Sequence, residues 1–310
     1  MTGEWCDDPA GEVALDGADA LNVAELLRRT VETTGDRAVA RWLCETAVGL
    51  DADEFTAAMS EPVTERIVEH LEVMLGRYRS GEPLQYVLGR WGFRTLDLAV
   101  DPRVLIPRPE TEWVAGRAIE LAIARHRRTG SVCVADLGTG SGAIGLAVAA
   151  ELPLDGLEVW ISDVDADALD VARANLAGLG RCAVAVRVAQ GSWFAAFESL
   201  EQRPVFDVIV SNPPYIAEDS PDLDSAVRDH EPARALFSGR DGLDALSTIV
   251  AEAPGHLSVD GWLVLEIGSD QGAAVGRLLA ERGFVEVAIE PDPAGHDRIA
   301  VARWPDNVRE

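Results

Sequence analysis

One short stretch of the chain has residue types that could bind a ligand. It consists of Asn212, Pro213, Pro214 and Tyr215, and it comes directly after the apolar run 206–211, where a buried strand is expected to end. Proline has no backbone N–H, so this loop offers carbonyl acceptors without competing donors, and the fixed φ of its prolines stiffens it. The Asn212 side chain adds an acceptor, and the Tyr215 ring adds a flat apolar face. Such a pocket fits a planar NH2 group, in an amide or an exocyclic amine, better than a carboxylate. The same residues are also compatible with a simple turn.

A second group of residues forms a glycine loop between the apolar run 132–137 and a helical pattern, which is the context that a nucleotide-type loop requires. Its members are Gly138, Thr139, Gly140, Ser141 and Gly142. Glycine lets the backbone turn sharply and lets a ligand approach closely. Asp163 ends the next predicted strand, where a carboxylate can accept hydrogen bonds from both hydroxyls of a ribose. Together these residues predict a site for an adenosine-bearing cofactor.

The spacing of the glycines distinguishes between cofactors. The loop reads Gly-x-Gly-x-Gly rather than Gly-x-Gly-x-x-Gly, and the chain has no Gly-x-x-x-x-Gly-Lys phosphate loop. A loop with no phosphate to hold suits the methionine part of S-adenosylmethionine. Asp163 either caps the following helix or, as its place at a strand end favours, binds the ribose. Trp193, after the third predicted strand, either stacks beside adenine or packs in the core.

The elements that must position both groups appear as alternating strand and helix patterns after residue 130. Predicted strands are 132–137, 157–162, 183–188, 205–210, 262–267 and 285–290, with a last edge strand at 299–304; predicted helices are 142–151, 166–177, 242–256 and 270–282. Such alternation predicts an α/β fold with a largely parallel sheet covered on both faces. Ligands of such sheets bind outside the carboxyl ends of the strands.

The first part of the chain has a different pattern. Apolar residues at helical spacing in 21–27, 39–48 and 67–75 predict a small helical domain. Two short alternating runs between residues 91 and 100 predict a β-hairpin, and a helix over 110–128 follows. The expected domains are an acidic tail over 1–18, the helical domain over 19–88, a hairpin linker over 89–108 and the α/β domain over 109–310.

The composition of the 310 residues limits the kind of partner. The net charge of -26 disfavours nucleic acid, because phosphate binding draws most of its affinity from Lys and Arg. No apolar run reaches the length of a membrane span, and acids stand where a signal peptide carries basic residues, so we expect a cytoplasmic protein without membrane contact. The cysteines and histidines show no ligand spacing, and we expect no metal.

Several segments in a fixed order resemble the HemK/PrmC family of peptide chain release factor glutamine N5-methyltransferases. They are 82–89, 104–112, 138–142, 212–215, Glu231-Pro232 and 241–244. The ordered set across residues 20–303 is specific, whereas Asn-Pro-Pro-Tyr alone is shared with enzymes that methylate amino groups of nucleic acids.

The resemblance implies a class I (Rossmann-like) seven-stranded methyltransferase domain, joined by the hairpin to a helical N-terminal domain that engages the protein substrate. The residues implied to surround S-adenosylmethionine are Gly138, Thr139, Gly140, Ser141, Gly142, Asp163, Trp193 and Asn212. The residues implied to hold the substrate glutamine are Asn212, Pro213, Pro214 and Tyr215. The resemblance also implies that this glutamine belongs to the Gly-Gly-Gln loop of a class I release factor. We expect the enzyme to act as a monomer.

Two other acceptors stay open at this point, the glutamine of a ribosomal protein and the amino group of a nucleobase. The segment 108–112 resembles the release-factor branch of the family, and the net charge disfavours a nucleobase. Ser192 stands where relatives often carry an acid before the tryptophan, which leaves its contact with adenine open. Arg108 either approaches the acceptor site from the linker or holds its own loop in place.

Overall fold

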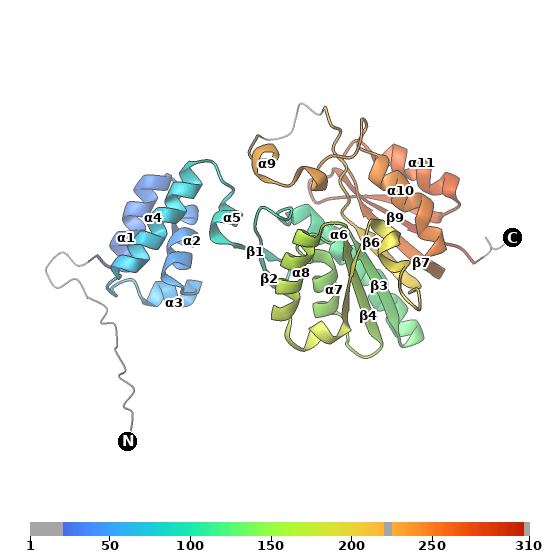
Figure 1. Cartoon of the computed structure of the whole chain (residues 1–310), viewed down its shortest axis with the longest axis horizontal. Coiled ribbons are helices and arrows are strands. Elements are labelled where there is room, and N and C mark those ends of the chain that lie inside the picture. Colours follow the sequence, from blue (N-terminus) through green and yellow to red (C-terminus); the bar gives the residue numbers. More distant parts are fainter. Residues whose placement is uncertain (1–20, 220–224, 307–310) are drawn as a thin grey trace, which may run out of the picture. The chain divides into compact units, whose positions relative to one another are not determined.

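In a computed structural model, the chain is described over residues 21–219 and 225–306 and divides into two compact units, Met1–Leu88 and Gly89–Glu310 (Figure 1). The acidic tail expected over residues 1–18 lies outside the described residues. No helix within the described ranges is long and apolar enough to span a membrane. The helical pattern and the α/β pattern of the sequence fall in different units, each with a core of its own.

The first unit is helical, as the spacing of its apolar residues predicts. Its helices are α1 (Val23–Thr34), α2 (Arg37–Val48), α3 (Ala52–Ala57), α4 (Glu65–Arg79) and α5 (Leu84–Leu88). The first four begin at side-chain caps, because Asn22, Asp36, Asp51 and Thr64 each accept a backbone N–H of the following turn. Phe55 is fully buried in the core that these helices share.

The second unit is built on a mixed sheet in the strand order β5-β4-β3-β6-β7-β9-β8. Its strands are β3 (Val132–Leu137), β4 (Leu157–Asp163), β5 (Val186–Gln190), β6 (Phe206–Ser211), β7 (Leu257–Glu266), β8 (Val285–Pro291) and β9 (Asp297–Arg303). The strands from β5 to β7 in this order pair in parallel, and β9 runs antiparallel to both β7 and β8. The prediction of a largely parallel seven-stranded α/β sheet is confirmed.

Helices cover both faces of this sheet (Figure 1). They are α6 (Pro109–Thr129), α7 (Ala143–Glu151), α8 (Ala166–Gly178), α10 (Asp244–Glu252) and α11 (Gly272–Arg282). The unit also contains the short helix α9 (Ser225–His230), which Figure 1 shows away from the sheet. Alternate residues of β3 point to opposite sides: Val132 and Val134 join the core under α6 and α7, whereas Ala135 and Leu137 join the core under α10 and α11. A strand buried on both faces explains why the run 132–137 is continuously apolar up to Asp136.

The hairpin of β1 (Arg90–Phe93) and β2 (Leu96–Ala99) belongs to this second unit. The Arg94 guanidinium, in the hairpin turn, binds the Glu151 carboxylate of α7 at 2.6 and 2.8 Å. The Asn175 side chain of α8 exchanges hydrogen bonds with the Ala99 backbone at 2.7 and 3.0 Å. These contacts fix the start of the segment 100–108, which leads from the hairpin into the site.

Some element boundaries differ from the prediction. β5 begins at Val186 instead of residue 183, because the 3-10 turn η1 (Gly180–Ala185), which starts with Gly180 at a φ of 63°, takes up the first apolar residues. β7 begins at Leu257, which pairs with Phe206 across a register shift. α10 ends at Glu252, because the turn η4 (Ala253–Gly255) contains Pro254.

Candidate functional site

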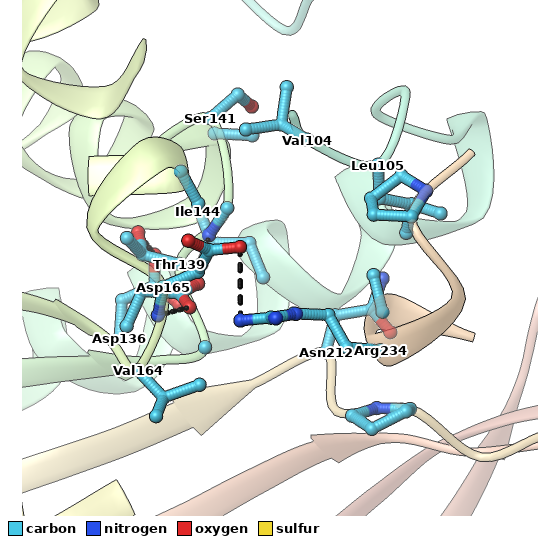
Figure 2. A pocket seen from close by; sticks show the side chains of 18 of the residues that line it. Val104, Leu105, Asp136, Thr139, Ser141, Ile144, Val164, Asp165, Asn212 and Arg234 are labelled. Carbon is cyan, nitrogen blue, oxygen red and sulfur yellow. Dashed lines mark hydrogen bonds and ion pairs between the residues drawn. The ribbon is translucent and has the colours of Figure 1, made fainter. Parts of the chain in front are cut away.

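A pocket opens at the carboxyl ends of β3, β4 and β6, the edge at which parallel sheets bind ligands. Figure 2 shows Asp136 and Thr139 beside the glycine loop, Val164 after β4, and Val104 and Leu105 from the segment that follows the hairpin. The structure thus brings most of the predicted cofactor residues together. Those that line the pocket are Gly138, Thr139, Gly140, Ser141, Asp163, Trp193 and Asn212.

The glycine loop has backbone angles that side-chain-bearing residues rarely adopt. Gly138, Gly140 and Gly142 have φ values of 68°, 54° and 88°. A Cβ atom at Gly138 would lie 3.3 Å from the ring of Trp193, so this ring covers the loop. Gly142 does not line the pocket; it precedes α7, where a Cβ atom would lie 2.8 Å from the Leu146 side chain. The glycine at this position is explained by its left-handed backbone at the start of the helix and by the nearby Leu146 side chain.

Asp163 ties the end of β4 to the glycine loop. Its carboxylate accepts the backbone N–H of Gly140 at 3.0 Å and that of Asp165 at 2.9 Å. The N-cap of α8 is Asp165, whose carboxylate accepts the N–H of Asp167 at 3.0 Å. The capping role therefore falls to Asp165, and Asp163 lines the pocket with a carboxyl whose pKa is raised by burial.

Asp136 is a fully buried acid at the wall of the same pocket. Its Oδ2 atom accepts the Thr139 hydroxyl at 2.5 Å and the Gly145 backbone N–H at 2.9 Å. Its Oδ1 atom finds no hydrogen-bond partner within the described residues. Burial raises the pKa of this carboxyl to about 6. A buried carboxylate with a free oxygen calls for a cationic donor, since an unpaired buried charge is strongly unfavourable.

The two carboxylates test whether these residues fit S-adenosylmethionine. Asp163 can accept hydroxyl donors beside its two backbone contacts, and the free Oδ1 atom of Asp136 needs a donor such as an ammonium group. S-adenosylmethionine carries both kinds of donor, on its ribose and on its methionine part. The lining of the pocket also includes the apolar side chains of Ile144 and Val164 (Figure 2). These two acceptors and the apolar lining are therefore compatible with this cofactor.

The stretch 212–215 borders this pocket and a second cavity. The residues that line both cavities are Leu105, Asn212 and Ala235. Pro214 lines the first cavity and Tyr215 the second, whereas Pro213 is buried and lines neither. Two adjoining cavities with common walls are the arrangement that a group transfer between two bound molecules requires.

The Asn212 side chain has a defined orientation. Its Nδ2 atom donates a hydrogen bond to the Thr111 hydroxyl of α6 at 3.1 Å, which leaves its Oδ1 atom as an acceptor. The Tyr215 hydroxyl donates to the buried Glu266 carboxylate at 3.1 Å. Burial raises the pKa of Tyr215, so this side chain stays a neutral donor. Asn212 therefore offers an acceptor oxygen, whereas the Tyr215 hydroxyl is a donor bound to Glu266.

Arg108 holds the segment before α6 in place. Its guanidinium donates to the Glu231 carboxylate, which also accepts the backbone N–H of Ile106 at 3.1 Å. The Glu231 side chain is only 1% exposed, whereas that of Arg108 is 31% exposed and lines the second cavity. Arg108 thus joins the segment 106–108 to Glu231 and also lines the cavity that Tyr215 lines.

Arg234 reaches across the first pocket. Its guanidinium lies 3.1 Å from the Asp165 carboxylate, and Figure 2 shows this pair spanning the space between the two sides. Arg234 is part of the turn η3 (Ala233–Ala235), and its side chain is 62% exposed. The ion pair therefore closes part of the entrance with contacts that solvent can reach.

Residues 19–89 match the family described as PrmC N-terminal domain, and residues 121–230 match the family described as Methyltransferase small domain. A release factor glutamine methyltransferase of Xylella fastidiosa is 46% identical over 245 residues, which make up 79% of this chain and 84% of the relative. The chain belongs to the release factor glutamine methyltransferase family. A family member from Burkholderia pseudomallei is 38% identical over 91% of this chain and 96% of its own.

Among solved structures, the hMettl16 catalytic domain shares the fold, with a TM-score of 0.51 at 16% identity over 76% of this chain and 82% of that chain. The Rossmann-like class that the sequence predicts for this release factor glutamine methyltransferase family member is thereby confirmed. Among the described residues, no group of three or more His, Cys, Asp or Glu side chains could hold a metal ion.

Four polar residues of this methyltransferase site carry no role in the sequence-based prediction. Asp136 and Glu266 each interrupt an apolar strand near its end, which is a readable signal for a buried acid at a ligand edge. Thr111 has no such signal, because its contact with Asn212 joins residues far apart in the chain. Arg234 likewise follows a region without strand or helix periodicity.

Proposed function

We propose that the chain transfers the methyl group of S-adenosylmethionine to the side-chain amide nitrogen (N5) of a protein glutamine, in the Gly-Gly-Gln loop of a class I peptide chain release factor. Its relatives from Xylella fastidiosa and Burkholderia pseudomallei, which carry the name release factor glutamine methyltransferase, support this substrate. The observation that carries the proposal is the place of Asn212, whose amide oxygen is available beside both cavities.

S-adenosylmethionine supplies an electrophilic methyl group on a sulfonium centre. We assign its ribose hydroxyls to Asp163 and its ammonium group to Asp136, since each carboxylate lines the pocket and one oxygen of Asp136 needs a donor. Trp193 covers the loop at Gly138 and is positioned to flank the adenine. The remaining cofactor contacts are assigned to Thr139, Gly140, Ser141 and Asn212, with Gly142 supporting the loop from the helix start.

An amide nitrogen is a poor nucleophile because its lone pair is delocalised. In this proposal the Asn212 side-chain oxygen, which borders both cavities, accepts an amide hydrogen of the glutamine, which directs the nitrogen at the methyl group and favours positive charge on it. The Pro213 residue is buried and lines neither cavity, so we assign it to the shape of the loop. Pro214 and Tyr215 shape the walls, and positioning and acceptor electrostatics supply the catalysis. We assign no general base, because the proton becomes acidic only as the new N–C bond forms and then leaves to solvent.

Recognition of the protein substrate is assigned to the helical domain over 19–88, with the hairpin linker over 89–108 and the methyltransferase domain over 109–310. The match of residues 19–89 to the PrmC N-terminal family supports a role for this unit that is specific to the family. The net charge of -26 argues against stable binding of nucleic acid. We propose a cytoplasmic enzyme that acts as a monomer.

The test is to incubate the full chain with methyl-labelled S-adenosylmethionine and, separately, with class I release factors, a ribosomal-protein fraction and duplex DNA. We expect label on a release factor, with mass spectrometry placing one methyl group on the glutamine of its Gly-Gly-Gln loop. A release factor with this glutamine replaced by Glu is the matched control and should stay unlabelled. Label confined to a ribosomal protein or to DNA would replace the proposed substrate.

A further inference from the structure

Glu266 ends β7 and is buried beneath the acceptor loop, with a relative exposure of 1%. Each oxygen of its carboxylate takes a different hydroxyl: Oε2 accepts that of Thr111 at 2.7 Å, and Oε1 accepts that of Tyr215 at 3.1 Å. Thr111 lies on α6 and Tyr215 follows β6, so this single side chain joins three separate elements. The Thr111 hydroxyl then accepts the Asn212 amide at 3.1 Å.

The direction of these hydrogen bonds follows from the chemistry of the groups. An ionised carboxylate only accepts, so the single proton of the Thr111 hydroxyl is committed to Glu266. The Thr111 oxygen can then only accept from Asn212, which must present its NH2 end. The reversed amide would place two oxygens face to face with no proton between them, a loss of the order of a hydrogen bond or more.

We infer that Glu266, acting through Thr111, is a positioning residue that fixes which end of the Asn212 amide faces the substrate glutamine. This inference rests on the proposed function, because the orientation of the Asn212 oxygen matters only when the group that accepts the methyl is an NH2 group. Neither Glu266 nor Thr111 has to touch the glutamine for this role. Their contribution is to keep Asn212 from turning its own NH2 toward the amide that it must bind, where donor would meet donor.

The same network predicts a dependence on pH. Burial raises the pKa of Glu266, the hydroxyls of Thr111 and Tyr215 and the charge of Arg298 on β9 lower it, and the charge of Glu110 on α6 raises it. Once Glu266 is protonated, its carboxyl can donate to Thr111, whose own proton is released to point at Asn212. The amide then has no preferred orientation, so turnover should fall on the acid side, above the usual carboxyl range.

The experiment compares full-length wild type with Thr111→Val, Thr111→Ser and Glu266→Gln in methylation of a class I release factor at saturating cofactor. Saturation separates kcat from effects on cofactor binding. For Thr111→Val and for Glu266→Gln we expect kcat to fall about 10- to 100-fold, as loss of one oriented polar group in a buried site does. Thr111→Ser keeps the hydroxyl and should retain most of the turnover.

Two further readouts separate positioning from a general structural role. In Thr111→Val the Kd of S-adenosylmethionine by calorimetry should change little, whereas the thermal midpoint should fall, because Oε2 of the buried Glu266 carboxylate loses its hydrogen bond. The acid limb of the kcat profile should be present in wild type and Thr111→Ser and absent in Glu266→Gln. Thr129→Val, at the far end of the same helix with its hydroxyl on backbone carbonyls, is the matched control and should behave as wild type.

Equal kcat for wild type and Thr111→Val, or equally low kcat for Thr111→Ser and Thr111→Val, would overturn the inference. If Thr111→Val does not fold, the other measurements decide: a kcat profile of wild type without an acid limb also overturns it. A wild-type enzyme that binds S-adenosylmethionine but leaves every release factor unlabelled would instead defeat the proposed function.

Discussion

Replacing Asp136 with Asn should make the protein more stable and its cofactor binding weaker. Folding raises the pKa of this carboxyl from 3.8 to about 6, chiefly by burial. The folded state therefore favours the protonated acid, and ionisation of Asp136 lowers the free energy of unfolding. This loss of stability is absent below about pH 4, grows between about pH 4 and 6, and is constant above about pH 6. A shift of about two pKa units at about 1.4 kcal/mol each corresponds to about 3 kcal/mol.

The Asp136→Asn substitution removes this penalty, while the new amide oxygen keeps the two donors, Thr139 and Gly145, that now bind Oδ2. The new NH2 group takes the place of the free Oδ1 atom and lacks an acceptor, which offsets part of the gain. We expect Asp136→Asn to raise the free energy of unfolding by about 1–3 kcal/mol at pH 7.5 and by close to nothing at pH 4. Urea unfolding of the cofactor-free protein at both pH values measures this.

Cofactor affinity should move the other way. The variant loses a charge-assisted hydrogen bond to the ammonium group, about 1.5–3 kcal/mol or roughly a 10- to 150-fold rise in Kd. The wild-type Kd should also rise as the pH falls below about 6, whereas that of Asp136→Asn should not follow this trend. Calorimetric titration with S-adenosylhomocysteine gives both values. Asp170→Asn, an exposed acid on α8, is the control. An unchanged Kd together with unchanged stability in Asp136→Asn would refute the reasoning.

Three other substitutions test other parts of the site. Asn212→Ala should lower methylation of the release factor by roughly 100-fold or more while the cofactor Kd stays within about tenfold, because it removes an oriented acceptor; full turnover would contradict its assignment. Arg234→Ala removes the ion pair with Asp165 across the pocket, so the cofactor should dissociate up to about fivefold faster in stopped flow, the range expected for an exposed pair. High salt should raise the dissociation rate of the wild type to that of the variant. Equal rates for the two proteins at low salt would contradict a closing role. Gly138→Ala adds a Cβ atom 3.3 Å from the Trp193 ring at a φ of 68°, so it should destabilise the protein by about 1–2 kcal/mol and weaken cofactor binding; wild-type values in urea unfolding and calorimetry would contradict this.

The fold can be predicted from the sequence wherever the burial of an element requires a recognisable pattern of apolar residues. The strands β3 and β6 are buried along most of their length and mostly apolar, and β4 alternates buried apolar residues with partly buried ones; the predicted bounds of all three hold to within a residue. β5 was misplaced because apolar residues at 183–185 also suit a packed 3-10 turn, and hydrophobicity alone does not separate the two. The early start of β7 depends on pairing with Phe206, which is a tertiary event.

The site was predictable where its chemistry is local in the chain. The glycine loop and Asp163 can be recognised in the sequence from their residue types and spacing, and the loop 212–215 can be recognised from its two prolines. The network beneath this loop cannot be recognised in this way, because Thr111 and Glu266 lie 155 positions apart and the sequence does not show that they meet. Gly142 shows the converse: it is a glycine within a binding motif whose requirement comes from a φ of 88° at the start of α7 and not from a place in the pocket.

The common walls of the two cavities have a consequence for inhibitor chemistry. The proposed function puts the adenosine in the first cavity and the glutamine amide in the second, and Leu105, Asn212 and Ala235 border both, so we expect one molecule with an adenosine at one end and a carboxamide at the other to bind in both at once. Binding of the second end then becomes intramolecular, at an effective concentration in the millimolar range for a short linker. Selectivity would come from the carboxamide end, since enzymes that share only the adenosine pocket have no oriented acceptor to receive it.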